Sequence, residues 1–194
     1  MYAPRPCGSV HIRYTNLLRF CVLPAKGHPA HAQFTIRDYR AADFDQLWQI
    51  DQLCFPEGIA YTQMDLSGFI MKRNAVTLVA ERQAAEAVAK TDVSTNHPAI
   101  AGFVVAHPIR GNIGRILTLD IVPEARRFGL ASRLMQECER RLQATGCSRV
   151  YLETAVTNEA ALRLYHKLGY EIVRIFPQYY SSQSLDAFQM TKHL

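Results

Sequence analysis

The hydrophobic pattern of this chain changes period several times, and each change predicts a structural element. The residues from Ile116 to Val122 are rich in apolar and β-branched types and have the length of a buried strand. Pro123 ends that strand, because proline has no N–H to donate to a strand ladder. From Leu130 the apolar residues recur at every fourth position, as on one stripe of a helix, and Gly146 is the residue type at which helices commonly end. The centre of the chain is therefore predicted to be a strand, a short turn and a long helix.

The same reasoning predicts the elements on either side. Two helices are expected early in the chain, one behind a cap at Asp43 and one behind Thr62, which forms a variant capping box with Asp65. Asn158 is expected to cap a later helix that closes at Gly169. The other strands are predicted at 33–39, 75–82, 99–107, 149–154, 170–176 and 185–193, with a turn at 110–114 and a long loop at 83–98.

This order of elements predicts an α/β (α+β) fold in which a mixed sheet carries helices on both faces. The length of 194 residues suits one domain, expected at 33–194. Residues 1–32 contain scattered prolines and no acidic side chain, so they are expected to be a disordered extension.

Charge and cysteine content exclude several classes of function. The net charge is +5, but the first 37 residues hold five basic and no acidic residues, so the remainder is neutral. A nucleic-acid enzyme normally carries its basic patch on the folded domain, and none is expected here. No apolar run approaches the length of a membrane-spanning helix. The five cysteines are scattered without CxxC spacing, which argues against a metal site or a disulfide framework and favours the reducing cytoplasm.

The turn between the central strand and helix has the character of an anion site. It reads Arg126-Arg127-Phe128-Gly129-Leu130-Ala131. The first turn of a helix presents N–H groups and a partial positive charge, and a glycine allows a phosphate to approach the backbone. This turn resembles the acyl-CoA pyrophosphate loop of the GNAT acetyltransferase superfamily, Arg/Gln-x-x-Gly-x-Gly/Ala. The alternative is an ordinary strand-to-helix turn with surface arginines.

A second set of residues strengthens the resemblance. The segment from Leu152 to Tyr170 contains Leu-Glu-x-x-x-x-Asn, then Ala, Leu-Tyr and Gly-Tyr, and twelve positions separate Glu153 from Tyr165. This pattern is similar to that of bacterial ribosomal-protein alanine N-acetyltransferases and related protein N-terminal acetyltransferases. The resemblance implies a mostly antiparallel sheet of about seven strands and transfer of an acetyl group from acetyl-CoA to an amine.

The resemblance also implies roles for particular residues. Glu153 would accept a proton from the attacking amine, and Tyr165 would donate one to the departing thiolate. The alternatives are a Glu153 that only pairs at the surface and a Tyr165 that only packs in the core. The scattered cysteines are not placed as nucleophiles, so direct attack on acetyl-CoA is expected. The cofactor would contact Leu119, Asp120, Ile121, Arg126, Arg127, Phe128, Gly129, Leu130, Ala131, Ser132, Asn158 and Tyr165.

The acceptor side is predicted from two aromatic segments. They resemble the walls that N-terminal acetyltransferases place around a peptide, and they contain Phe55, Pro56 and Tyr61 in one and Tyr179 and Tyr180 in the other. The alternative is a pair of aromatic plugs at the sheet edge. Two departures weaken the match, since Thr154-Ala155-Val156 replaces a segment that often carries arginine and Phe128 replaces a residue that is often basic.

These observations lead to one main hypothesis and two alternatives. The main hypothesis is an acetyl-CoA-dependent N-acetyltransferase that acts on the α-amino group of a protein N-terminus, as a monomer or homodimer. The second is an acetyltransferase for a small amine or a lysine side chain. The third is an acyl-CoA-binding regulatory module without turnover.

Overall fold

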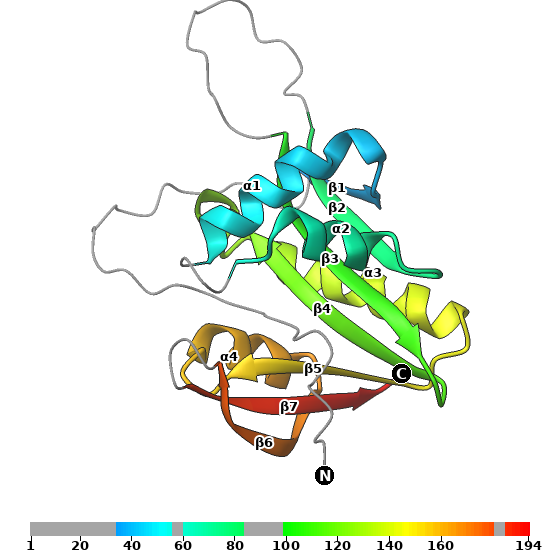
Figure 1. Cartoon of the computed structure of the whole chain (residues 1–194), viewed down its shortest axis with the longest axis vertical. Helices are drawn as coiled ribbons and strands as arrows, with labels where there is room; N and C mark the ends of the chain where they lie inside the picture. Colours follow the sequence, from blue (N-terminus) through cyan, green and yellow to red (C-terminus); the bar gives the residue numbers. More distant parts are fainter. Residues whose placement is uncertain (1–33, 56–59, 84–98, 181–184) are drawn as a thin grey trace, which may run out of the picture.

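The computed structural model describes residues 34–55, 60–83, 99–180 and 185–194 (Figure 1). The expected extension at 1–32, most of the expected loop at 83–98 and Pro56 lie outside the described residues. The strands are β1 (Phe34–Asp38), β2 (Val76–Arg82), β3 (Ile100–Ile109), β4 (Ile113–Ile121), β5 (Arg149–Ala155), β6 (Glu171–Tyr180) and β7 (Leu185–His193). The helices are α1 (Phe44–Cys54), α2 (Gln63–Ile70), α3 (Leu130–Ala144) and α4 (Glu159–Lys167), with 3₁₀ turns η1 (Ala41–Asp43) and η2 (Pro123–Ala125).

The seven strands form one sheet in the order β1-β2-β3-β4-β5-β7-β6. Every neighbouring pair is antiparallel except β4 and β5, which run parallel on either side of α3 in the sequence. Parallel neighbours need a crossover connection, and α3 supplies it. The predicted fold class, a mixed and mostly antiparallel sheet of about seven strands, is therefore confirmed.

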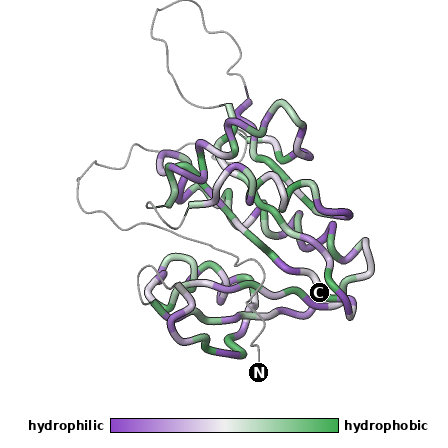
Figure 2. Tube along the Cα trace, in the orientation of Figure 1, coloured by the Kyte–Doolittle hydropathy of each residue, from purple (hydrophilic) through white to green (hydrophobic). Residues whose placement is uncertain are grey.

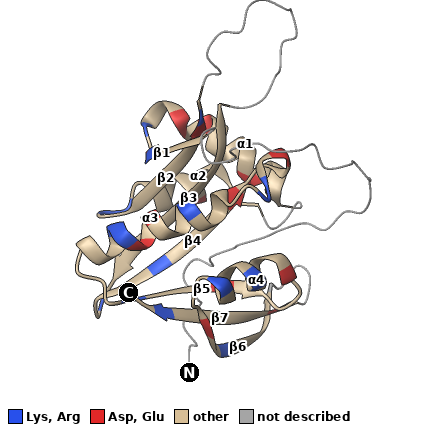
Figure 3. Cartoon of the chain, turned by 180° about the vertical axis from the view of Figure 1, so that it is seen from behind, with Lys and Arg blue, Asp and Glu red and all other residues tan. Residues whose placement is uncertain are grey.

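Helices cover both faces of the sheet. Figure 1 shows α1 and α2 in front of the strands, and the reverse view in Figure 3 brings α3 forward. The apolar stripe of α3 predicted from the sequence is buried, and the helix packs against β1 to β4. Figure 2 shows the hydrophobic positions running along β3 and β4, the central strands between these layers. In the described part of the chain, no helix combines the length and apolarity that crossing a membrane requires.

Helix ends follow the predicted capping residues in most cases. The Thr62 side chain accepts a hydrogen bond from the Asp65 N–H at 3.1 Å, and Asn158 accepts one from the Ala161 N–H at 3.2 Å. Gly146 and Gly169 lie beyond the ends of α3 and α4 with φ of 93° and 87°, the left-handed conformation that glycine tolerates.

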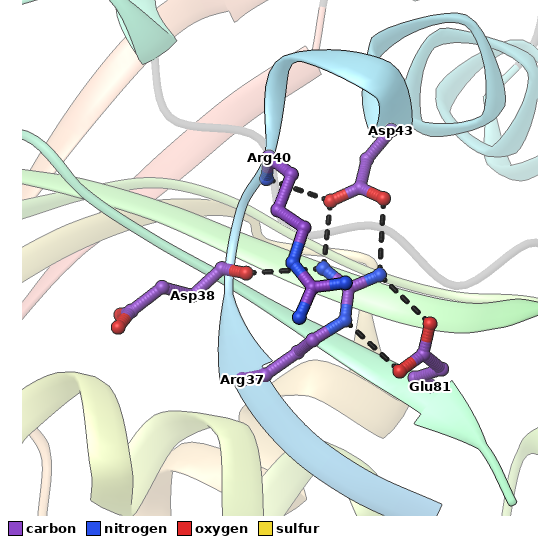
Figure 4. A network of polar contacts seen from close by, with 5 residues as sticks. All are labelled: Arg37, Asp38, Arg40, Asp43 and Glu81. Atoms are coloured by element: carbon purple, nitrogen blue, oxygen red, sulfur yellow. Dashed lines mark hydrogen bonds and ion pairs between the residues drawn. The ribbon is translucent and has the colours of Figure 1, made fainter.

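Asp43 differs from its prediction. It precedes α1, but its side chain accepts no hydrogen bond from that helix. Instead its carboxylate accepts from the Arg40 N–H at 2.7 Å and from two nitrogens of Arg37 at 2.7 and 3.0 Å, while Arg37 also holds Glu81 (Figure 4). A charge-assisted bidentate bond is stronger than a neutral cap. The network therefore fixes the start of α1 to β1 and β2.

β3 ends two residues later than predicted, at Ile109, and β4 and β6 are also longer than predicted. β4 begins at Ile113, inside the expected turn, and β6 continues to Tyr180 rather than ending at Phe176. Pairing explains both extensions, since Ile113 lies in register with Ile109 and Tyr180 lies in register with Leu185. Long-range pairing of this kind is invisible to local hydrophobic patterns.

Candidate active site

The parallel strands β4 and β5 form a fork. They are in register only at three positions, which end with Arg115 opposite Tyr151. Beyond this pair, β4 continues to Ile121 and β5 continues to Ala155. Figure 1 shows the two strands diverging from their shared end. Along the fork, the facing edges of β4 and β5 do not pair with each other and are therefore available to bind another molecule.

A β-bulge lies in β4 just beyond the start of the fork. Thr118 pairs with Val105 and Ile116 pairs with Ala106, so Leu117 is an extra residue on the β4 side. Bulges bend a strand and re-aim its groups. This one bends β4 at the level where β5 leaves it.

One hydrogen bond shows which way the main-chain N–H groups of β4 point. The Val122 N–H donates to the Ala101 carbonyl of β3 at 2.9 Å. Amides alternate in direction along a strand, so those of Leu119 and Ile121 point away from β3, toward the open side of the fork. These are the amides that the sequence predicts as cofactor contacts. The side chains of Leu119 and Asp120 are themselves buried and belong to the core.

The segment between β4 and α3 forms a tight turn with unusual backbone angles. Arg127 has φ of 69° and Gly129, the N-cap residue of α3, has φ of 74°. A non-glycine residue in the left-handed region costs free energy, and such residues are found in turns and at functional sites. Successive N–H groups in such turns form a concave surface that attracts anions. The predicted anion site therefore has the backbone geometry it needs.

A cavity of about 150 Å³ lies at this turn. A Cβ added at Gly129 would meet no atom within 4 Å, so the space above the glycine is open. Most predicted cofactor residues of the loop line the cavity, together with two residues that the sequence analysis did not include, Ala125 and Leu164 of α4. The full lining is Ile121, Ala125, Arg126, Arg127, Gly129, Leu130, Ala131, Ser132 and Leu164.

Arg126 and Phe128 of the loop differ in their surroundings. The Arg126 guanidinium folds back, with Nε donating to the Ile121 carbonyl at 3.0 Å and Nη2 contacting the Cys54 sulfur at 3.7 Å. Arg126 thus braces the turn against β4 and α1. Phe128 is 42% exposed, which is high for a phenylalanine, and it does not line the cavity.

Glu153 lies on β5 two residues beyond the last β4–β5 pair and is only 4% exposed. Its Oε2 accepts from Arg115 Nη2 at 3.2 Å, and its Oε1 accepts from Gln189 Nε2 of β7 at 3.3 Å. The carboxylate is therefore turned toward β4, across the start of the fork. Glu153 is therefore paired, as the alternative expects, but the pair is buried rather than at the surface.

Tyr165 and Asn158 lie on and before α4. Tyr165 is fully buried, and its ring packs edge-on against Tyr170 with centroids 5.6 Å apart. Its neighbour Leu164 lines the loop cavity, but Tyr165 does not. Asn158 is 7% exposed and caps α4. Packing and capping are thus established for these residues, whereas their contacts with the cofactor remain predictions.

One predicted acceptor wall reaches β4 at the bulge. The Tyr61 hydroxyl donates to the Leu117 carbonyl at 3.4 Å, and the Tyr61 N–H donates to Asp51 of α1 at 2.7 Å. Phe55 is buried at the end of α1 and its N–H donates to the Asp51 carbonyl at 3.1 Å. The two ends of segment 55–61 are therefore both anchored to α1.

The other predicted wall lies on β6. Tyr179 is half-buried and stacks on Phe176 with ring centroids 5.7 Å apart. Tyr179 is among the groups that raise the pKa of Arg115, so its phenol is within electrostatic reach of the guanidinium at the start of the fork. The side chain of Tyr180 is outside the described part of the structure.

The sequence analysis missed several polar residues at the fork. Arg115, Gln189 and His107 had no predicted role, yet Arg115 and Gln189 bind Glu153, and His107 is the partner of Arg115 across β3 and β4. His107 is 7% exposed, and burial, with help from Lys72 and Arg115, lowers its pKa to about 4. Strand alternation would place Arg115 on one face, but the pairing of β4 with β5 and β5 with β7 is not readable from local sequence.

Comparison with known proteins agrees with this geometry. A model of the acetyltransferase (GNAT) family matches residues 44–170. An N-alpha-acetyltransferase of Sulfurisphaera tokodaii is 26% identical over 174 residues, covering 84% of this chain and 94% of that protein.

Solved structures share the fold. NAA60 of Arabidopsis thaliana in complex with acetyl-CoA has a TM-score of 0.69 at 21% identity, covering 83% of this chain and 98% of that chain. The ribosomal-protein-S18-alanine N-acetyltransferase of Escherichia coli has a TM-score of 0.66 at 18% identity, covering 82% of this chain and 93% of that chain. Because the family model spans more than half of the chain, including the loop cavity and Glu153, the chain belongs to the acetyltransferase (GNAT) family and is an acetyl-CoA-dependent N-acetyltransferase.

Proposed function

We propose that this protein acetylates the α-amino group of protein N-termini, and that the amine attacks acetyl-CoA directly with Glu153 as general base. The observation that carries the mechanism is the buried Glu153 carboxylate, turned toward β4 at the start of the fork. The acceptor class is supported by the relatedness to an N-alpha-acetyltransferase along most of both chains.

Residues of the loop are suited to hold the donor. Amides at the start of α3 and in the Arg127–Gly129 turn would bind the pyrophosphate of acetyl-CoA, and the open space above Gly129 admits it. The cavity beside the turn is lined by Arg126, Arg127 and Ser132 as well as by glycine and apolar residues. Amides of Leu119 and Ile121 would then receive the acetyl carbonyl and the negative charge that develops on it.

In the net reaction the acceptor ammonium gives up two protons and the sulfur gains one, so one proton passes to solvent. The ammonium first loses a proton, which Glu153 accepts directly or through one water. The neutral nitrogen then attacks the thioester carbon, its bond to carbon forms, the nitrogen releases its second proton, and the carbon–sulfur bond breaks. The thiolate of CoA is protonated as it leaves. Tyr165 is the candidate donor because it lies on α4 next to Leu164, which lines the loop cavity. No residue of the chain is acylated.

Acceptor basicity favours an α-amine over a lysine. With its ordinary pKa, an α-amine is neutral in roughly a tenth of molecules at pH 7, whereas a lysine is neutral in fewer than about one in a thousand. A single carboxylate base therefore removes the proton more easily from an N-terminal ammonium than from a lysine side chain. Aromatic walls with hydroxyl groups, such as Tyr61 and Tyr179, suit a peptide backbone. We place the reaction in the cytoplasm, where the buried free thiols of Cys54, Cys138 and Cys147 would stay reduced.

The test combines an acceptor panel with one substitution. Peptides with varied first residues, N-terminally blocked lysine peptides and small amines are assayed for thiol release from acetyl-CoA, and the products are located by mass spectrometry. Free N-terminal peptides should react at least tenfold faster than the blocked lysine peptides. Faster modification of lysines or small amines would overturn the proposed acceptor.

Glu153→Gln tests the base. Its kcat/KM should fall by about 100-fold or more at neutral pH, with the Kd for acetyl-CoA unchanged. The matched control is Glu159→Gln on α4, an exposed residue paired with Arg163 at 3.1 Å, which should retain full activity. Equal activity of both variants across pH would refute Glu153 as the base.

A further inference from the structure

Arg115 lies at the point where β4 and β5 separate. It is the last residue of β4 in register with β5, opposite Tyr151, and its guanidinium lies 5.6 Å from the centre of the Tyr151 ring. The side chain is only 13% exposed. A buried guanidinium on an aromatic face has little freedom to move. Arg115 is therefore a fixed cation at the start of the fork.

The same guanidinium binds the proposed base. Arg115 Nη2 donates to Glu153 Oε2 at 3.2 Å, and Gln189 Nε2 donates to Oε1 at 3.3 Å, so each carboxylate oxygen receives one hydrogen bond. Burial lowers the pKa of Arg115, but the charge of Glu153 and its hydrogen bond, together with Tyr151 and Tyr179, raise the pKa overall. The cation is thus permanent, and the pair spans the two arms of the fork.

We propose that Arg115 is the positioning residue for Glu153: it holds the carboxylate toward β4 and favours its charged, proton-accepting form. This inference rests on the proposed function. Burial alone favours the neutral form of a carboxyl group, which cannot accept a proton from an ammonium, and a neighbouring cation opposes that effect. When the proton moves from the amine to Glu153, Arg115 keeps its charge but loses its counter-ion, so the pair favours release of that proton and return of Glu153 to the carboxylate form.

Other titratable groups near the pair come from four elements. His107 on β3 is the cross-strand neighbour of Arg115 and is neutral near pH 7, because burial lowers its pKa to about 4. Tyr151 on β5 and Tyr179 on β6 are neutral phenols at that pH, and Lys72 after α2 acts on His107. Gln189 on β7 carries no charge. Arg115 is the cation that contacts the Glu153 carboxylate.

The experiment compares Arg115→Met with Arg115→Lys. Arg115→Met should lower kcat/KM for the acceptor peptide by about 10- to 100-fold and move the acidic limb of its pH profile to higher pH, with the Kd for acetyl-CoA unchanged. Arg115→Lys keeps a cation and should keep the wild-type acidic limb while recovering part of the rate. Added guanidinium ion should partly rescue Arg115→Ala. An unchanged pH limb in Arg115→Met would overturn the inference.

A double substitution separates this inference from the proposed function. In the Glu153→Gln background, adding Arg115→Met should lower kcat/KM by less than twofold, because Arg115 acts through Glu153. If Glu153→Gln is impaired but Arg115→Met still causes its full loss in that background, the base stands and the positioning role is wrong. If Glu153→Gln is fully active, the base itself is wrong. Arg140→Met, on the exposed face of α3, is the matched control and should change none of these quantities.

Discussion

The proposed donor and acceptor sides of the fork are built in different ways. The proposed donor side centres on one segment, and its main features are main-chain amides, a left-handed glycine and a helix N-terminus. The proposed acceptor side is assembled from side chains that belong to five separate parts of the chain, namely Tyr61, Arg115, Glu153, Tyr179 and Gln189. A main-chain site tolerates changes of side chain around it. A side-chain site does not, so a substitution there can change the acceptor while the donor is kept.

The largest expected effect is on the donor side. Gly129→Glu should raise the Kd for acetyl-CoA by at least about 100-fold, because it adds a carboxylate where a pyrophosphate binds and forces a side chain into a left-handed backbone. Isothermal titration calorimetry with acetyl-CoA measures this directly.

The matched control for that change is Gly146→Glu. Gly146 also has a positive φ and open space around it, but it lies at the far end of α3. Its substitution should lower thermal stability and leave acetyl-CoA affinity intact. Equal loss of affinity in both variants would mean that strain alone, rather than the anion site, explains the effect of Gly129→Glu.

A second prediction concerns the scaffold that the donor and acceptor sides share. Asp43→Asn removes the ion pair with Arg37, and the free energy of unfolding at pH 7 should fall by about 2 kcal/mol while acetyl-CoA affinity is kept. The hydrogen bonds from Arg37 lower the pKa of Asp43. The stabilisation is therefore present above the ordinary aspartate pKa and is lost as pH falls through the lowered one. Urea unfolding at pH 7 and at pH 3 should show the two proteins converging at the lower pH.

Tyr61→Phe tests whether the acceptor side can be changed alone. It removes the hydrogen bond to the Leu117 carbonyl, and the KM for an acceptor peptide should rise by about three- to tenfold. The Kd for acetyl-CoA should stay within twofold of wild type. Tyr39→Phe is the control, since Tyr39 lies beside α2 and β2, away from the fork. If Tyr61→Phe instead weakens the binding of acetyl-CoA, the bulge couples the acceptor side to the donor side.

The smallest expected effect is at Phe128. Phe128→Lys restores a basic residue to an exposed position of the loop, and acetyl-CoA should bind about two- to threefold more tightly at low salt. The gain should vanish at about 1 M salt, where screening is strong. Phe128→Ala, which adds no charge, should show no salt-dependent gain, and a gain in both variants would contradict an electrostatic cause.

Local sequence was sufficient to predict the strand–turn–helix that contains Gly129 and insufficient to predict the side chains around Glu153. Gly129 and its basic neighbours are adjacent in the chain, so their strand–turn–helix context was readable from hydrophobic period and one glycine. Arg115, Gln189 and His107 meet Glu153 or each other only through the pairing of four strands, and strand register depends on long-range contacts. Asp43 was predicted as a simple cap because its partner Arg37 lies on β1 and is itself held by Glu81 of β2, contacts that the local pattern does not show.

The extra residue in β4 also inverts the parity of that strand. Before Leu117, the even-numbered Gly114 faces α3, where an added Cβ would meet Leu142. After it, the even-numbered Asp120 lies on the side of α1, where burial and the Asp120 charge together raise the pKa of the Cys54 thiol to about 12. Deleting Leu117 would remove the bulge and restore plain alternation, with Gly114 and Asp120 still on opposite faces of the sheet. A one-residue gap there in a related chain would therefore mark a β4 that keeps its two faces but lacks the bend beside the fork.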